Sequence, residues 1–216
     1  MINFFDAETL PTNDESVIAE LEKTISPPGN IKKAESIKIW MDENKESALL
    51  DLVAKTSFDG MYGRIACIAW CSGDGEILNT TPDYSEGEAI GAYYDYLSFS
   101  FDNSFCGHNI FGFDLPFLKH RSIILDIAPP DSLWKAMNSK QWDSCIQDTM
   151  LMWNQDKQKR VSAAKLCKVL NIESDDEIDG SMVAETWLTD PDKVIYHCVE
   201  DVRKVRQIYK RLTFNR

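Results

Sequence analysis

The stretch INFFDAETLPT, residues 2 to 12, decides the fold, because an apolar run there ends in two acids, Asp6 and Glu8. The apolar and aromatic residues predict a core strand over residues 2–8. Side chains two positions apart on a strand leave from the same face, about 6 to 7 Å apart, so these acids can share one site. Two carboxylates so close repel unless protonated, hydrated or bound to cations. An isolated pair of this kind usually marks a strand that ends at the surface, so the pair needs support from elsewhere in the chain.

Two later stretches supply further acids in apolar surroundings. GHNIFGFDLPFLKHR, residues 107–121, places Asp114 after a short buried strand and at the start of a helix. An Asp in this position often only caps its helix. VIYHCVEDVRKVRQIYKRL, residues 194–212, places Asp201 inside the terminal helix, beside its apolar stripe. A mid-helix Asp beside a buried face is unfavourable without a metal or a basic partner.

The order of patterns along the chain predicts an α/β fold with helices on both sides of a mixed five-stranded sheet. Strands are expected at 2–8, twice within the hairpin 63–81, at 104–109 and at 144–151. Helices are expected at 14–24, 34–56, 86–98, 114–125, 161–170 and 190–213, and the Pro-containing segment before residue 144 is expected to be a loop. Residues 11–60 break this alternation. We interpret them as a helical insertion after the first strand of a single domain that covers residues 1–216.

Composition narrows the class of protein. The chain has 216 residues, 44% of them hydrophobic, which is enough for a sizeable core. No apolar stretch approaches the ~20 residues that span a bilayer, so no membrane partner is expected. Six cysteines are scattered without a CxxC pair, which favours reduced thiols in the cytoplasm. The net charge of −12 argues against a protein that holds nucleic acid mainly by blanket phosphate neutralisation, although not against nucleic acid as a substrate. The basic runs 157–168 and 203–211 are expected to be solvated helix faces.

The three acidic segments, taken in order, resemble the Exo I, Exo II and Exo III motifs of the DnaQ-like (DEDD) 3′-5′ exonucleases. FFDAET resembles the first motif, HNIFGFDLPFL the second motif of family B DNA polymerase proofreading domains, and CVEDV the last. QDTMLMW and SAAKLCKVLNI resemble the connecting segments of stand-alone phage and bacterial exonucleases of this kind. The resemblance spans nearly the whole chain. It implies a ribonuclease H-like three-layer fold, with the insertion as an addition.

The resemblance also implies a site. Asp6, Glu8, Asp114 and Asp201 would be the acidic ligands of two divalent cations, Mg²⁺ or Mn²⁺, that support hydrolysis of the terminal phosphodiester. Substrate contacts would come from Thr9 and Leu10 beside the terminal nucleotide and from Asn109 on the backbone.

The last motif departs from both known subgroups. The tyrosine subgroup has a Tyr four residues before the final Asp and the histidine subgroup has a His five before it, whereas this chain has His197 at minus four and Tyr196 at minus five. Residues four apart on a helix differ by about 40° in direction and residues five apart by about 140°. His197 therefore faces the same way as Asp201, and we hypothesise that it orients or deprotonates the attacking water. The alternative is a histidine that only packs or caps, with Tyr196 as the assisting or substrate-binding residue.

The function predicted from these residues is metal-dependent removal of nucleotides from single-stranded DNA 3′ ends. RNA is the first alternative substrate, because no motif here reads the 2′-hydroxyl. A second alternative is an inactive nucleic-acid-binding module of the same fold, although four retained and mutually repelling acids argue against it. The insertion at 11–60 is a candidate docking site for a replication or repair protein. A dinucleotide-binding protein is disfavoured, because no GxGxxG follows the first strand.

Overall fold

The computed structural model describes residues 1–99, 103–154 and 159–215, and its centre is a five-stranded sheet in the order β3-β2-β1-β4-β5. The strands are β1 (Ile2–Leu10), β2 (Arg64–Ser72), β3 (Leu78–Asn79), β4 (Ser104–Gly107) and β5 (Ile146–Asp148). β1 pairs antiparallel with β2 and parallel with β4, and β4 pairs parallel with β5. The predicted mixed α/β sheet is confirmed, with β1 at its centre.

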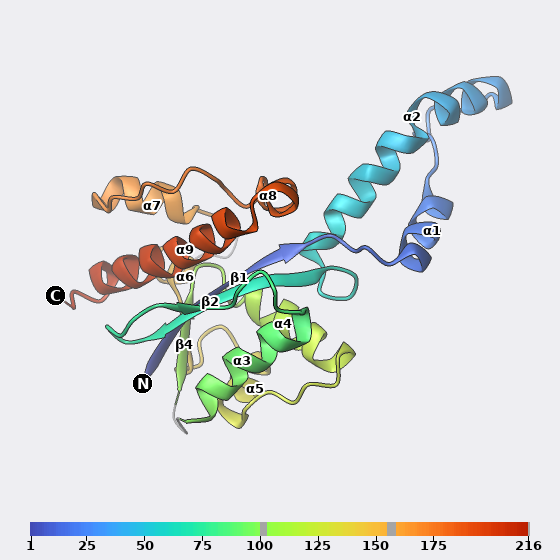
Figure 1. Ribbon diagram of the computed structural model, residues 1–216. Coiled ribbons are helices and arrows are strands. Elements are labelled where there is room, and N and C mark those ends of the chain that lie inside the picture. The colour runs from blue at the N-terminus through green and yellow to red at the C-terminus, as the bar shows by residue number, and fades with distance from the viewer. Residues whose placement is uncertain (100–102, 155–158, 216) are drawn as a thin grey trace.

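Helices cover both faces of the sheet, as Figure 1 shows. α3 (Glu86–Ser98), α4 (Asp114–Ile124) and α5 (Asp131–Met137) lie on one face, and α7 (Ala163–Leu170), α8 (Val183–Thr189) and α9 (Pro191–Leu212) lie on the other. α6 (Thr149–Asn154) follows β5 directly and contacts α9. The three layers match the ribonuclease H-like arrangement that the sequence predicts.

The alternation of β1 decides what each face carries. Phe5 and Ala7 pack in the core cluster beneath α3 and α4, whereas Phe4 and Leu10 pack in the cluster beneath α9. Asp6 lies on the same side as Phe4 because side chains alternate along a strand. The carboxyl groups of β1 therefore face the layer that contains α9.

Helix α9 is fixed against the sheet by a regular apolar stripe. Asp190 caps its first turn by accepting a hydrogen bond from Lys193 N (3.2 Å), and Pro191 occupies the first helical position, where its missing N–H is harmless. The stripe is buried at Val194, Cys198, Val202, Val205 and Ile208. Full burial of such a side chain stabilises the fold by about 1.5 to 3 kcal/mol relative to exposure. This stripe sets which residues of α9 face β1.

The two helices expected in the insertion are present, as α1 (Glu15–Thr24) and α2 (Ala34–Lys55) between β1 and β2. They pack on each other and project away from the sheet (Figure 1). Neither contains a buried residue. Their base is tied to the domain by two hydrogen bonds, from Thr12 N to Thr56 Oγ1 (2.8 Å) and from Thr9 Oγ1 to Ser57 O (2.7 Å).

Three short helices were not expected from the sequence. α5 occupies the predicted loop, where Pro130 sets the turn and Asp131 favours the positive end of the helix. α8 lies in the connection before α9. The strand predicted over 144–151 is wrong in length, since β5 ends at Asp148 and α6 begins at Thr149. Asp148 accepts hydrogen bonds from the backbone N–H groups of Met150 and Leu151, and this cap turns the chain from strand to helix.

The longest described helices, α2 and α9, have 22 residues each and carry charged side chains along their length. No helix in the described part of the chain combines the length and the apolar character needed to cross a bilayer. All six cysteines are free thiols, and five of them are buried.

Candidate active site

The four predicted carboxyl groups meet at one cavity. Asp6 and Glu8 reach it from β1, Asp114 from the first turn of α4 and Asp201 from the middle of α9, and the cavity has a volume of about 600 Å³. The structure thus brings together acids that are up to 195 positions apart, from Asp6 to Asp201. Their predicted roles as metal ligands and catalytic groups remain predictions.

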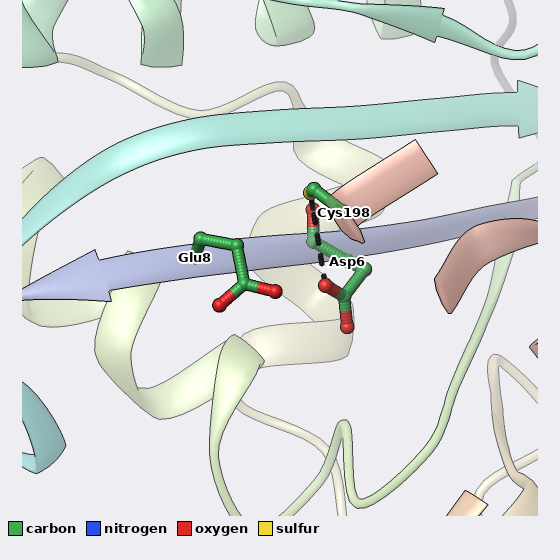
Figure 2. A group of neighbouring side chains, drawn as sticks. All are labelled: Asp6, Glu8 and Cys198. Atoms are coloured by element: carbon green, nitrogen blue, oxygen red, sulfur yellow. Dashed lines mark hydrogen bonds between the residues drawn. The ribbon is translucent and has the colours of Figure 1, made fainter. Parts of the chain in front are cut away.

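The β1 acids lie beside a thiol of α9, as Figure 2 shows. Ligand atoms of Asp6, Glu8 and Cys198 all lie within 4.8 Å of one another. Cys198 Sγ is 3.4 Å from Asp6 O and 3.7 Å from Asp6 Oδ2, so the thiol donates towards that residue. A second group, Glu8, His197 and Asp201, also has ligand atoms within 4.8 Å of one another.

The electrostatics of the cluster oppose its ionisation. Burial, followed by the neighbouring carboxyl groups of Asp114, Glu8 and Asp201, raises the pKa of Asp6 well above its usual value. Burial and the carboxyl group of Asp201 raise the pKa of Glu8 well above its usual value in the same way. Both shifts follow from like charges held together away from water.

Asp114 is held by the end of the sheet. Its carboxyl group accepts hydrogen bonds from the backbone N–H of Ala7 and from its own N–H, which lower its pKa, but burial outweighs them and raises the pKa to about 7. Asp114 is therefore locked against β1 between Asp6 and Glu8. The Asp114 side chain therefore contacts β1 and does not simply cap α4. The turn before the helix is closed by a separate backbone hydrogen bond, from Leu115 N to Ile110 O.

Positive charge reaches the cluster through Lys204. Its Nζ lies 2.7 Å from Asp201 Oδ1 and 2.6 Å from Asp176 Oδ2. Burial lowers the pKa of Lys204, but the two carboxylates outweigh it and raise the pKa to about 12, so the ammonium stays charged. The expectation that the basic run 203–211 is a solvated helix face is wrong at Lys204, which is buried. The sequence analysis did not single out Asp176. Lys204 carried a signal, because it lies three residues after Asp201 on the same helix face.

His197 faces the carboxyl groups, as its spacing from Asp201 predicts. Its Nε2 lies 3.3 Å from Glu8 Oε1, and its Nδ1 lies 2.6 Å from Asp176 Oδ2. Tyr196 points elsewhere: the residue is 45% exposed, its hydroxyl donates to Asp175 Oδ1 (2.7 Å), and it does not line the cavity. The geometry thus gives His197, and not Tyr196, access to the site.

Asn109 lines the cavity in a left-handed conformation (φ 64°), which Asn tolerates better than most residues. Its N–H donates to Asp148 Oδ1 (3.1 Å), and Phe111 N donates to Asp148 Oδ2 (3.1 Å). Gly112 leaves room for the Asn109 side chain, because a Cβ there would lie 2.5 Å from Asn109 Oδ1. Asp148 therefore shapes the loop that presents Asn109, a role that the sequence analysis missed.

Thr9 and Leu10 are not among the residues that line the cavity. Leu10 is buried beneath α9, and the Thr9 hydroxyl is bonded to the base of the insertion. Their predicted contacts with a terminal nucleotide stay predictions. Part of the basic run 157–168 does reach the cavity, at Arg160 and Lys165, whereas residues 157 and 158 lie outside the described residues.

The donor set fits a divalent cation. Four carboxyl groups offer hard oxygen ligands of the kind that Mg²⁺ and Mn²⁺ prefer. Within the described ranges, no lysine or arginine pairs with Asp6, Glu8 or Asp114, so the raised pKa values report a deficit of positive charge. The carboxylate cluster is therefore compatible with bound divalent metal.

Comparison with known proteins agrees with this fold. The fold is similar to that of the family B DNA polymerase from the hyperthermophilic archaeon Pyrobaculum calidifontis, with a TM-score of 0.61 and 14% identity. The similarity covers 98% of this chain but only 24% of the polymerase, so the chain spans about a quarter of that protein. No curated protein matches the chain in sequence.

A family match supplies the sequence relationship. Residues 63–216 match a family described as a predicted 3′-5′ exonuclease related to the exonuclease domain of PolB. The matched part begins after the insertion and includes Asp114 and Asp201, and it covers most of the chain. The chain therefore belongs to the family of predicted 3′-5′ exonucleases related to the exonuclease domain of PolB.

Proposed function

We propose that this protein is a metal-dependent 3′-5′ exonuclease that removes nucleotides from single-stranded DNA ends by hydrolysis of the terminal phosphodiester. The observation that carries the proposal is the convergence of Asp6, Glu8, Asp114 and Asp201 at one cavity with too little positive charge to balance them. A purely structural site would not gather four acids in this way, two of them buried and two only partly exposed.

These four residues would hold two divalent cations, Mg²⁺ or Mn²⁺. Such ions, when bound, lower the pKa of an attacking water and stabilise the charge that develops on the departing 3′ oxygen. The protein's part is to fix the carboxyl groups, and it does so through the β1 strand, through the bond from Ala7 N–H to Asp114 and through the ion pair between Lys204 and Asp201.

His197 is the proposed acceptor of the proton from the attacking water. Its Nε2 faces Glu8 at 3.3 Å, whereas its Nδ1 is engaged by Asp176, so Nε2 is the ring nitrogen available to the cavity. Imidazole has an ordinary pKa of about 6.5, which suits proton transfer near neutral pH. Asn109, Arg160 and Lys165 line the same cavity and are proposed to bind the phosphates of the strand.

DNA is the proposed substrate because the similar solved structure is a DNA polymerase and because the second motif resembles polymerase proofreading domains. An acidic protein can act on a polyanion when bound cations supply positive charge at the site. RNA remains the alternative substrate. The reduced state of the thiols fits the cytoplasm, and α1 and α2 are proposed to dock a replication or repair protein.

The test is a nuclease assay on single strands. DNA and RNA oligonucleotides labelled at the 5′ end are incubated with Mg²⁺ or Mn²⁺, with chelator and with the Asp6→Ala variant as controls. We expect a ladder of products shortened from the 3′ end of DNA, absent with chelator or with the variant. Degradation of RNA alone would reassign the substrate. If neither DNA nor RNA is degraded and metal does not stabilise the protein, the alternative of an inactive nucleic-acid-binding module is favoured.

A further inference from the structure

Two adjacent acids in the loop between α7 and α8 bind two adjacent residues of α9. Asp175 Oδ1 accepts a hydrogen bond from the Tyr196 hydroxyl (2.7 Å), and Asp176 Oδ2 lies 2.6 Å from His197 Nδ1. The two contacts join residues that are adjacent in the sequence on both sides, but their surroundings differ. Asp175 and Tyr196 are exposed, whereas the side chains of Asp176 and His197 are only 4% and 6% exposed.

The loop is held along α9 by more than these two contacts. Lys193 Nζ pairs with Glu177 Oε2 (2.9 Å), and Arg203 Nη2 donates to Glu173 O (2.8 Å). Bonds at both ends of the segment thus fix it against successive turns of the helix. Asp176 is the member of this loop whose carboxyl group points inward.

Asp176 has a full set of partners. Besides His197, its Oδ2 accepts from Lys204 Nζ (2.6 Å), and its Oδ1 accepts from Ile178 N (3.4 Å). A carboxylate that accepts from a lysine has no proton to give to imidazole. His197 Nδ1 therefore carries the hydrogen of the contact, and Nε2 is left facing Glu8 and the cavity.

We propose that Asp176 is a positioning residue, which holds His197 with Nδ1 protonated and Nε2 turned towards the attacking water. The inference rests on the proposed function for the chemistry, and on the contacts above for the geometry. Either nitrogen of a histidine ring can carry the proton, so an acceptor at one nitrogen fixes both the tautomer and the direction of the ring. Lys204 braces Asp176 and also binds Asp201, so a single ammonium links the positioning carboxylate to the metal-site carboxylate.

The first test reads the ring directly and needs no activity. The protein contains three histidines, and ¹⁵N-labelled histidine rings can be followed by NMR with Mg²⁺ present. The His197→Gln variant identifies the signals of His197. We expect a proton on Nδ1 that exchanges slowly with water because it is buried in the contact with Asp176. A ring with Nδ1 unprotonated, or with the fast exchange of an exposed ring, overturns the proposal whatever the nuclease assay gives.

The second test is kinetic and uses a matched control. Asp176→Asn should lower kcat on single-stranded DNA by about 10- to 100-fold with KM within about twofold, by analogy with the loss of a carboxylate that orients a metal-ligating histidine. Asp175→Asn, the same change one residue earlier, should leave kcat unchanged. In the His197→Ala background, Asp176→Asn should change kcat by less than about threefold, because the residue acts through the imidazole.

The outcomes separate the proposals. A kcat loss that persists in full in the His197→Ala background, or an Asp176→Asn enzyme as fast as wild type, overturns the positioning role. A wild-type protein without nuclease activity refutes the proposed function instead, and the NMR result on Nδ1 then still decides the contact. Should Asp176→Asn fail to fold, the NMR measurement on the wild-type chain decides alone.

Discussion

Lys204 and Asp201 form an ion pair on one face of α9, with Nζ 2.7 Å from Oδ1. The Asp201 side chain is 26% exposed, so the pair lies at the edge of the acidic cluster, although the Lys204 side chain is only 9% exposed. The ammonium thus supplies the cluster with a fixed positive charge that is present before any metal binds.

Replacing this ammonium should make the protein depend more on metal. Lys204→Met leaves Asp201 and Asp176 without their shared cation, so we expect the free energy of unfolding of the metal-free protein to fall by about 1 to 3 kcal/mol, less than for a fully buried pair. Since the folded form then gains more from a cation, the rise in Tm on addition of Mg²⁺ should exceed that of wild type.

Lys193→Met is the matched control for that experiment. Lys193 is on the same helix and pairs with Glu177, but both side chains are well exposed, at 39% and 76%. Exposed pairs contribute only about 0 to 1 kcal/mol. An equal loss of stability in both variants, or an unchanged response to Mg²⁺ in Lys204→Met, would contradict the role assigned to Lys204.

Asp6→Asn should separate stability from activity. Burial and three neighbouring carboxyl groups disfavour the charge of Asp6, so a neutral isostere should raise the Tm of the metal-free protein by a few degrees at pH 8, on the order of 1 kcal/mol. Hydrolysis of single-stranded DNA should fall by more than about 10³-fold. Thermal melts and single-turnover assays measure the two effects, and Asp95→Asn, an exposed acid on α3, should change neither. A destabilised Asp6→Asn protein would show that Asp6 has a favourable partner.

The stability of the metal-free protein should depend on pH through Asp114. Its pKa is about 7 in the folded protein and near the ordinary 3.8 when unfolded. Between these values the folded form holds a proton that the unfolded chain has released, so the free energy of unfolding falls as the pH rises from about 4 to about 7. The slope from one such group is at most about 1.4 kcal/mol per pH unit.

Denaturant unfolding with chelator at several pH values measures this slope. Asp114→Asn should reduce this slope without abolishing it, because Asp6 and Glu8 also have raised pKa values, whereas Asp42→Asn, an exposed acid on α2, should leave the slope unchanged. Because protons and cations compete for the same oxygens, stabilisation by Mg²⁺ should be greater at pH 8 than at pH 5.5. A wild-type protein whose unfolding free energy rises across this range would refute the assignment.

Local patterns, together with the resemblance to a known family, were sufficient to identify the four acids that meet at the cavity, but not their partners. The period of two in β1 placed Asp6 and Glu8 on one face, and the period of the terminal helix aligned His197 with Asp201. Asp176 could not be found in the same way, because it belongs to an irregular loop that follows no period. Its contact with α9 depends on how that loop folds back on the helix.

The same limit explains the errors in the elements. The long helix α9 was predicted within a few residues because its apolar residues recur at helical spacing. The short helices α5, α6 and α8 have 7, 6 and 7 residues, too few for a repeat to be recognised. They depend on local caps, such as Asp148 for α6, and on tertiary packing.

Removal of the projecting helices should leave the sheet and its site intact. α1 and α2 contribute no buried residue, and Thr12 N lies 2.8 Å from Thr56 Oγ1, so a short Gly/Ser linker can replace residues 15–54 without moving the ends. Shortening a loop changes the closure free energy only slowly, and we expect the free energy of unfolding to change by less than about 2 kcal/mol. Cooperative unfolding and stabilisation by Mg²⁺ should persist.

Thr56→Ala in the full chain is the comparison, because loss of the buried bond to Thr12 should itself cost about 1 kcal/mol. If the deletion variant unfolds without cooperativity while Thr56→Ala stays folded, α1 and α2 stabilise the sheet. If the deletion variant folds but no longer binds a replication or repair protein, the docking site lies on these helices.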